Sequence, residues 1–244
     1  MRFAYMVQSE GALPASFHEV RADPDVALFH LTFRDEAPDA IFLPGSTWTE
    51  GRNRLLEQAR ASGSAFDYFI FSDDDVGFAA GSWKGFQADL EAHRPAIGVP
   101  AFYDPDGCPD VHAVYDFDAI VTAFHRDVIE DGLVLPYIAD FDADSWWLSQ
   151  YFVIHLANAL YPNGVVKLPR TAVTNIQHRA YPRIEADRFG DYDSAYFALW
   201  QDHDWARQRF RTHFLTRDDP PFPPALAESY RVLPDLRDRL KPRG

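Results

Sequence analysis

The chain has 244 residues, and hydrophobic residues make up 47% of it and aromatic residues 15%, which excludes disorder across the whole chain. The net charge of −14 excludes nonspecific nucleic-acid binding and disfavours attachment to an anionic membrane. The single cysteine, Cys108, excludes an intrachain disulfide and a thiolate metal cluster. No apolar run approaches the ~20 residues that span a bilayer, and the first residues lack the features of a signal peptide, so we expect a cytoplasmic protein.

Short apolar runs alternate with amphipathic stretches along the chain up to about residue 180. The pattern predicts strands at 2–7, 26–33, 40–43, 68–71 and 96–103, and helices at 13–21, 49–61 and 82–93. Strands are also predicted at 111–115 and 119–125, in the manner of a hairpin, and at 165–168 and 172–177, with the longest helix at 145–161. This alternation predicts an α/β sandwich around a largely parallel sheet.

The remaining residues, 181–244, have a different character. We expect a polar loop first, then helical stretches at 192–214 and 225–240 on either side of a proline-rich linker at 218–224. We therefore predict one domain at 1–180 and a helical, proline-containing extension at 181–244.

The most informative feature is an aromatic strand that ends in three acids, Asp73, Asp74 and Asp75. Three like charges at a strand end are tolerated if they reach water or if a cation neutralises them. Oxygen ligands of this kind favour Mg²⁺ or Mn²⁺ over a soft metal, and α/β folds bind ligands at the carboxyl ends of their strands. The alternative is a solvated turn in which Asp73 makes only local hydrogen bonds.

Two further polar groups border predicted elements of the first half. Gln8 and Ser9 follow the first strand, at the edge where ligands bind. Arg52, Asn53 and Arg54 occupy the first turn of the helix at 49–61, where cations oppose the helix dipole. They are either a receptor for a diphosphate, together with the free backbone N–H groups of that turn, or ordinary solvated helix residues.

Polar and aromatic residues also gather around the longest helix. Asp142 and Asp144 precede it, and Trp146 and Trp147 begin it. Either acid is a plain N-cap or a general base in a cleft with a tryptophan as its wall. His178 follows the last predicted strand, as a structural histidine or as a metal ligand.

This succession resembles glycosyltransferases of the GT-A fold over about residues 1–180. Four places carry the resemblance: residues 49–56 match their donor-side helix start, Asp73-Asp74-Asp75 their Asp-X-Asp motif, residues 142–147 their acceptor-side acid before a helix, and His178 a late metal-binding histidine. The resemblance implies a Rossmann-related α/β/α sandwich with a mixed, mostly parallel sheet, a donor half at about 1–103 and an acceptor half at about 104–180. Serine follows the acid here, where many inverting members have a Glu-Asp pair, which leaves the base and the stereochemical outcome open.

The resemblance also implies an activity: metal-dependent transfer of a sugar from a nucleotide-diphosphate sugar to a hydroxyl of a glycan, lipid or small molecule. Mn²⁺ or Mg²⁺ would be held by Asp75 and His178, with Asp73 contacting the metal shell or the ribose. Gln8 and Ser9 would lie near the base and ribose of the nucleotide.

The other candidate residues take their expected roles from the same resemblance. Asp74 and the segment Arg52-Asn53-Arg54 would face the donor. Asp144, with Asp142 second, would deprotonate the acceptor, beside Trp146 and Trp147. The alternatives are a noncatalytic carbohydrate- or nucleotide-binding protein of the same fold, or a metal-dependent phosphohydrolase with Asp73 as nucleophile.

Overall fold

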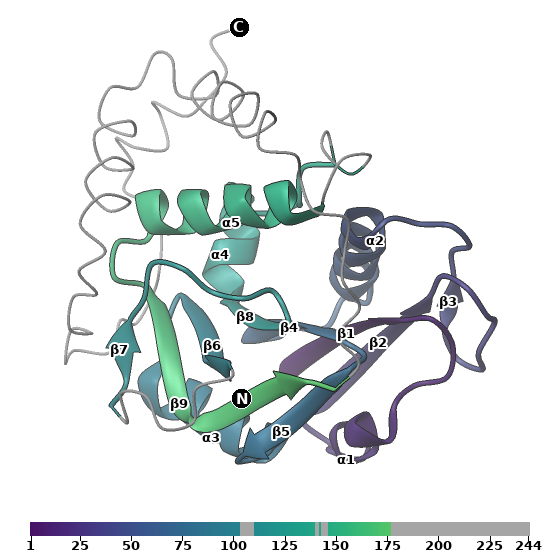
Figure 1. Ribbon diagram of the computed structural model, residues 1–244, viewed down its shortest axis with the longest axis horizontal. Coiled ribbons are helices and arrows are strands. Elements are labelled where there is room, and N and C mark those ends of the chain that lie inside the picture. The colour runs from purple at the N-terminus through teal and green to yellow at the C-terminus, as the bar shows by residue number, and fades with distance from the viewer. Residues whose placement is uncertain (103–109, 140–141, 143–145, 177–244) are drawn as a thin grey trace, which may run out of the picture.

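The computed structural model describes residues 1–102, 110–139, 142 and 146–176 (Figure 1). Asp144, His178 and the predicted extension at 181–244 lie outside the described residues. The division of the chain at residue 180 therefore stays a prediction.

One sheet forms the centre of the described part, with strands in the order β3-β2-β1-β4-β8-β6-β9-β5 and with β7 beside β9. The strands are β1 Phe3–Ser9, β2 Val26–Thr32, β3 Ile41–Phe42, β4 Tyr68–Asp73, β5 Val76–Ala80, β6 Ile97–Phe102, β7 His112–Ala113, β8 Val121–His125 and β9 Val165–Asn175. Strands β3, β2, β1 and β4 are mutually parallel, as are β6 and β9. Strand β8 runs antiparallel to β4 and β6, and β5 and β7 run antiparallel to β9, so the expected mixed sheet is confirmed.

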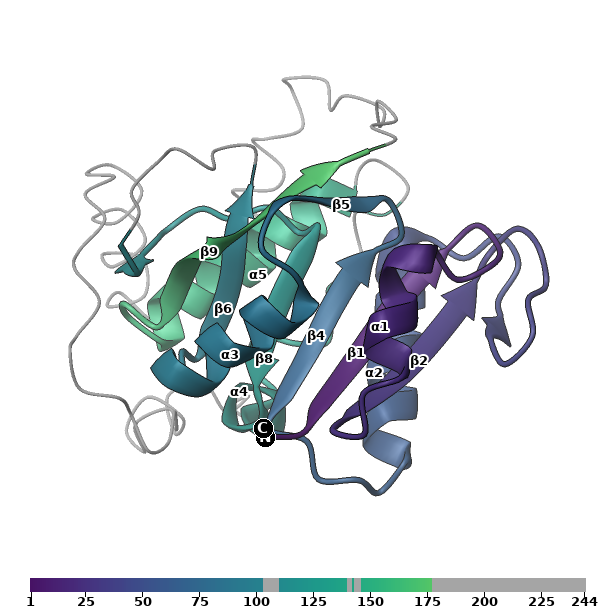
Figure 2. The same cartoon turned by 90° about the horizontal axis from the view of Figure 1, so that it is seen from below.

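Helices cover both faces of this sheet. They are α1 His18–Arg21, which follows a 3₁₀ turn at Ala15–Phe17, α2 Trp48–Ala61, α3 Trp83–His93, α4 Arg126–Asp131 and α5 Trp146–Leu160. Helices α1 and α3 lie on one face, and α2, α4 and α5 on the other (Figure 2). Among the described residues, no helix combines the length and the hydropathy needed to cross a bilayer.

Each face has its own hydrophobic core, and the side chains of β1 show why. Ala4 and Met6 pack into the core beneath α2 and α5, whereas Phe3, Tyr5 and Val7 pack into the core beneath α1 and α3. Successive side chains of a strand point to opposite faces, so a strand that is covered on both faces is apolar throughout. The α/β/α sandwich expected from the sequence is confirmed.

Two expectations about strands were wrong, and one strand was missed. The predicted hairpin does not form, because β7 pairs with β9 while β8 lies between β4 and β6. The two short strands predicted at 165–168 and 172–177 are one strand, β9, whose register against β6 shifts after Pro100. Strand β5, directly after the acids, was not predicted at all. Apolar periodicity identifies a strand but carries no information about its partner, and here the partners are distant in sequence.

Candidate functional site

The acids lie at the centre of the sheet edge. Strand β4 lies between β1 and β8, and its last residue, Asp73, is directly opposite Gln8 on the parallel strand β1. On the other side, the Asp73 N–H donates to the Ile120 carbonyl at 3.0 Å. The structure therefore brings Gln8 and Asp73 together at the carboxyl ends of neighbouring parallel strands, which is where α/β folds bind ligands.

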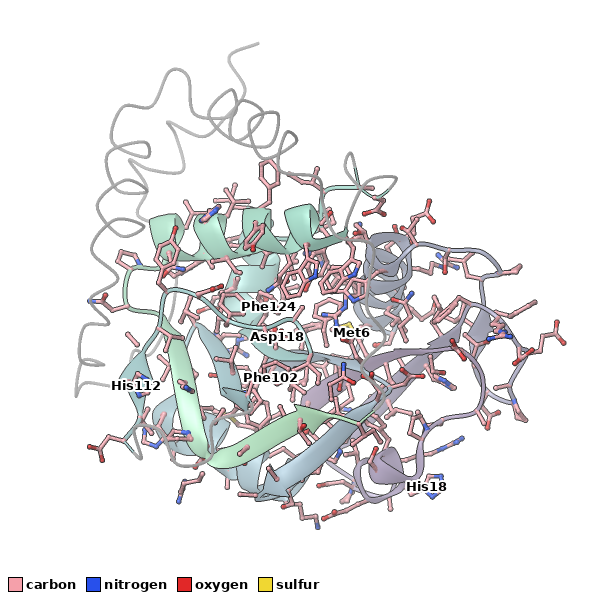
Figure 3. The ribbon with its side chains drawn as sticks, viewed as in Figure 1. Met6, His18, Phe102, His112, Asp118 and Phe124 are labelled. Carbon is pink, nitrogen blue, oxygen red and sulfur yellow. The ribbon has the colours of Figure 1, made fainter. Side chains whose placement is uncertain are left out.

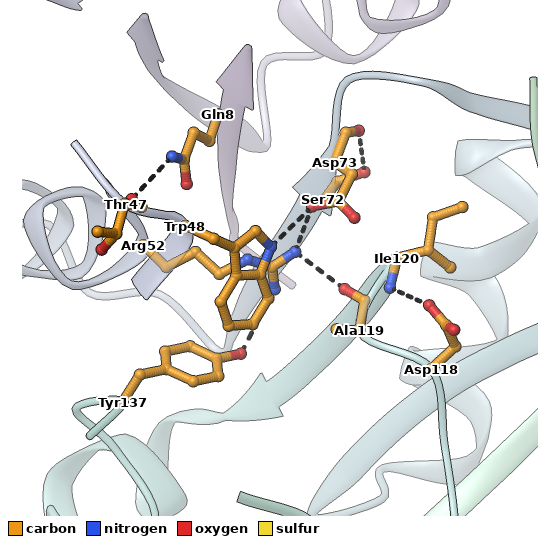
Figure 4. Close-up of polar contacts among 10 residues, drawn as sticks. All are labelled: Gln8, Thr47, Trp48, Arg52, Ser72, Asp73, Asp118, Ala119, Ile120 and Tyr137. Atoms are coloured by element: carbon orange, nitrogen blue, oxygen red, sulfur yellow. Dashed lines mark hydrogen bonds and ion pairs between the residues drawn. The ribbon is translucent and has the colours of Figure 1, made fainter. Parts of the chain in front are cut away.

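Arg52 is the buried counter-ion of Asp73. Its Nη2 donates to Asp73 Oδ1 at 2.6 Å and to the Ala119 carbonyl at 2.9 Å, and its side chain is only 1% exposed (Figure 4). The guanidinium lies 4.1 Å from the Trp48 ring centroid, and Trp48 Nε1 also donates to Asp73 Oδ1, at 3.3 Å. A buried cation requires such compensation. In this structure the hydrogen bonds of Arg52 hold the acid, and its expected place facing the donor stays a prediction.

Asn53 and Arg54 also have partners other than the acids. Asn53 Nδ2 donates to the Tyr137 carbonyl at 2.9 Å, and the Tyr137 N–H donates to Asn53 Oδ1 at 2.8 Å, so the side-chain amide pins the loop before α5. Arg54 lies on the surface, half exposed, in an ion pair with Glu57 at 3.1 Å. In this structure these two side chains have structural partners, and their expected role toward a diphosphate stays a prediction.

Asp74 and Asp75 form the turn between β4 and β5. Burial raises the pKa of Asp74 to about 6, and the charges of Asp75 and Asp73 add to the effect. The Asp75 carbonyl accepts from the Ile176 N–H at 2.8 Å, just beyond the end of β9. Within the described residues, no three His, Cys, Asp or Glu side chains converge on a metal position.

Gln8 and Ser9 differ in what they offer a ligand. Ser9 is 1% exposed, and its hydroxyl contacts the Gly11 carbonyl and His30 Nε2, both at 2.7 Å. Gln8 Nε2 donates to the Thr47 carbonyl at 3.2 Å, whereas its buried Oε1 has no hydrogen-bond partner in the described part of the chain. A buried acceptor without a partner costs free energy, which a ligand N–H would recover.

Asp142 links two helices. Its Oδ2 accepts from the Thr47 hydroxyl and its Oδ1 from Ser149 Oγ, at 3.4 Å. Thr47 is the N-cap of α2, where it forms a capping box with Glu50. Asp142, the second candidate for the base, therefore links the loop before α5 to the start of α2.

Trp146 and Trp147 belong to a stack of rings. Trp146 has Trp48 against it at 4.6 Å between ring centroids and Trp147 at 4.5 Å, with interplanar angles of 31° and 20°. Aromatic rings in such stacks cover one another's faces. Trp146 thus packs against two other rings, and its expected role beside the acceptor stays a prediction.

Two residues of the site were not predicted. Trp48 contacts Asp73, Arg52 and Trp146, although it gave no signal beyond its place at a helix start. Asp118 accepts from the Ile120 N–H at 2.8 Å, and burial raises its pKa to about 6. Its signal was a short acidic segment before a strand, which by itself predicts only a turn. Asp118 also lines a pocket of about 170 Å³.

The chain matches no known family model and no curated protein. It is similar to solved structures: TarS residues 1–349 of S. aureus superpose with a TM-score of 0.52 at 10% identity, over 88% of this chain and 72% of that one. The same TarS segment in complex with UDP-GlcNAc superposes with a TM-score of 0.51 at 10% identity, over 88% of this chain and 73% of that one.

A second neighbour is GalNAc-T7 in complex with UDP, GalNAc and Mn²⁺, with a TM-score of 0.56 at 10% identity, over 98% of this chain and 53% of that one. The chain thus spans about half the length of this neighbour. Identities this low establish the fold alone. The neighbours are glycosyltransferases, and the chain has their GT-A fold.

Proposed function

We propose that this protein is a glycosyltransferase that takes a sugar from a nucleotide-diphosphate sugar and transfers it to a hydroxyl acceptor. The observation that carries the proposal is the pairing of Gln8 with Asp73 at the sheet edge of a GT-A fold, with Asp73 held by buried Arg52. An acid that is fixed in this way, at the carboxyl end of a central strand, is preorganised to contact a polar ligand. The neighbouring TarS structure, of the same fold, holds UDP-GlcNAc.

We further propose that Mn²⁺ or Mg²⁺ binds at the acid turn. Carboxylate oxygens suit these hard cations, and three carboxylates follow one another at this turn. Burial is the main cause of the raised pKa of Asp74, and the charges of Asp75 and Asp73 add to it. Asp75 and His178 would hold the ion, with Asp73 at its edge. When bound, the metal supplies positive charge that neutralises the leaving diphosphate.

The chain's own residues would position the two substrates. Gln8 Oε1 would accept an N–H of the nucleotide base, since it lacks a partner. Arg52 would hold Asp73 toward the ribose or the metal shell. Asp144 would take the proton of the acceptor hydroxyl, and Asp142 would fix the loop that carries it through Thr47.

The nucleophile of a phosphohydrolase has to approach phosphorus with an available oxygen. Asp73 Oδ1 already accepts from both Arg52 and Trp48. Both contacts are made by one oxygen of the carboxylate, so they orient Asp73 without excluding it as a nucleophile. Release of phosphate from simple esters would favour hydrolysis over transfer.

The test measures thermal shifts with uridine and guanosine diphosphates, each with Mn²⁺, with Mg²⁺ and without metal, followed by donor hydrolysis across a nucleotide-sugar panel. A ligand at about 100 times its Kd stabilises the folded state by about 2.7 kcal/mol, which such a scan detects. We expect a metal-dependent shift that Asp75→Asn abolishes, and that the surface variant Asp39→Asn preserves. Binding without any donor turnover would support the noncatalytic alternative, and no metal-dependent shift with any nucleotide would contradict the proposal.

A further inference from the structure

The sheet opens into a fork next to the acid strand. Strands β6 and β8 pair only at Ile97 with Phe124 and at Gly98 with Ala123. Beyond Gly98, β6 continues along β9 alone, up to Phe102. The pocket of about 170 Å³ lies in this fork. Its lining comes from the end of β6, the loop before β8, the start of β8, and Lys167 of β9.

This pocket shares a wall with the candidate site. Strand β8 pairs with β4 through Val121 and Ser72, and neighbouring strands lie about 4.8 Å apart. Ile120, which lines the pocket, accepts from the Asp73 N–H, and the Ala119 carbonyl accepts from Arg52. Figure 4 shows Asp118 on the far side of this segment from Arg52. Residues 119–120 thus border both the acid strand and the pocket, so the pocket adjoins the place proposed for the diphosphate.

The lining of the pocket is chemically suited to a neutral sugar. Its apolar part, from Val99, Pro100 and Phe117 among others, offers contact to the C–H faces of a ring. Its charged groups are Asp116, Asp118 and Lys167, two carboxylates against one ammonium. Ionised carboxylates only accept hydrogen bonds, so they suit hydroxyl donors and repel another anion.

Asp118 is the best-placed of these groups. Its Oδ1 accepts from the Ile120 N–H at 2.8 Å, which fixes the carboxylate in the loop just before β8. Figure 3 shows Asp118 in the middle of the molecule, between the labelled residues Phe102 and Phe124. A partly buried carboxylate held by its own backbone loses little conformational entropy when a ligand hydroxyl binds to it.

We propose that the fork pocket binds the sugar ring of the donor and selects an uncharged sugar, with Asp118 as the specificity-determining residue that accepts hydrogen bonds from its hydroxyls. This inference rests on the proposed function, because it takes the donor to be a nucleotide-diphosphate sugar.

The experiment is isothermal titration in Mn²⁺ with three ligands: uridine diphosphate, UDP-glucose and UDP-glucuronate. The two sugars differ only in a carboxylate at carbon 6. The proteins are the natural chain, Asp118→Asn and the surface control Asp39→Asn, whose parent side chain lies in an exposed ion pair with Arg21. Asparagine keeps an oxygen for the Ile120 N–H, so Asp118→Asn preserves the loop.

We expect the natural chain and Asp39→Asn to bind UDP-glucose at least about 10-fold tighter than UDP-glucuronate, because the pocket carries net negative charge. Asp118→Asn is expected to raise the Kd for UDP-glucose about 10-fold and to leave the Kd for uridine diphosphate within about 2-fold of that of the natural chain. The ratio of the Kd values for UDP-glucuronate and UDP-glucose is expected to fall. Unchanged sugar binding in Asp118→Asn, with nucleotide binding intact, overturns this inference alone. Absence of binding by all three ligands and by their guanosine counterparts overturns the proposed function and the inference with it.

Discussion

At the scale of single residues, the site depends on how Asp73 is held. Arg52 is buried, stacks on Trp48 and donates one nitrogen to both Asp73 and the Ala119 carbonyl. It therefore joins the end of β4 to the loop before β8. Guanidinium is suited to this arrangement, because its planar fork makes several directed hydrogen bonds while stacking on a ring. The ammonium group of a lysine has the same charge but could not make the same set of directed hydrogen bonds while it stacks on Trp48.

Replacing Arg52 with lysine tests this. We expect Arg52→Lys to destabilise the protein by about 1–3 kcal/mol, since hydrogen bonds of buried groups are lost, and to weaken metal-dependent nucleotide binding. Thermal unfolding and nucleotide titration measure the two effects. The matched control is Arg54→Lys, two residues along the same helix, whose exposed ion pair with Glu57 is worth at most about 1 kcal/mol. Equal effects of the two changes would show that Arg52 is not special.

Asp118 gives a prediction for pH. Its pKa is raised from 3.8 to about 6, chiefly by burial, so the folded state binds its proton more tightly than the unfolded state does. The ionised group therefore costs stability above about pH 6, and this cost disappears as the pH falls toward about 4. Asparagine carries no such cost. We expect Asp118→Asn to raise the Tm at about pH 7.5, by roughly 2–4 °C for each kcal/mol, with the gain vanishing near pH 4. A gain independent of pH would contradict this origin.

At the scale of elements, the start of α2, from its N-cap to its second turn, connects the acid strand to the loop before α5. Thr47 caps the helix and donates to Asp142, Trp48 contacts Asp73, and Asn53 pins the backbone of Tyr137. Because the N-cap and the first two turns of α2 carry all of these contacts, the acid strand and the loop before α5 are held relative to each other. Residues 47–53, which overlap the segment that resembles a donor-side helix start, are therefore a structural link in this chain.

Thr47 allows this link to be weakened with a small change. Thr47→Val keeps the shape of the side chain but removes the hydroxyl that caps α2 and donates to Asp142. We expect a loss of about 1–2 kcal/mol from the cap, with faster hydrogen exchange in the loop at 136–142. Thr47→Ser retains the hydroxyl and is expected to stay close to the natural chain in both measurements. If Thr47→Val and Thr47→Ser have the same stability and the same hydrogen-exchange rates, the hydroxyl does not support the loop.

At the scale of the whole molecule, the charge balance matters most. The chain carries 37 acidic against 23 basic side chains, and the acid turn adds to this excess at one point of the sheet edge. Self-repulsion of this kind destabilises the compact state and is screened by salt. An anionic donor also has to approach a negatively charged protein, so a divalent cation at the acid turn would serve stability and binding together.

Salt titration checks the global term. We expect the Tm to rise as NaCl goes from about 0.01 M to about 0.15 M, where the Debye length falls from about 30 Å to about 8 Å. Low micromolar Mn²⁺, which changes ionic strength very little, is the comparison: it is expected to raise the Tm of the natural chain but not of Asp75→Asn. A Tm that falls with NaCl would contradict net self-repulsion.

The sequence by itself determined the class of fold and the location of the acids. Short runs that are apolar throughout predict a layered α/β sandwich, because a strand that is buried on both faces is apolar on both. The aromatic strand ending in Asp73 was likewise predicted, and so was the place of Gln8 at the end of the first strand. That Gln8 lies directly opposite Asp73 came only from the structure.

Only the tertiary structure decided what the polar groups do. Three findings depend on contacts between segments far apart in the chain. Arg52 pairs with Asp73, Asp142 accepts a hydrogen bond from Thr47, and β6 and β8 diverge around a pocket beside Asp118. Local periodicity reports how a residue sits in its own helix or strand. The partner of a charge, and hence whether it is a ligand or a support, is set by which elements pack together.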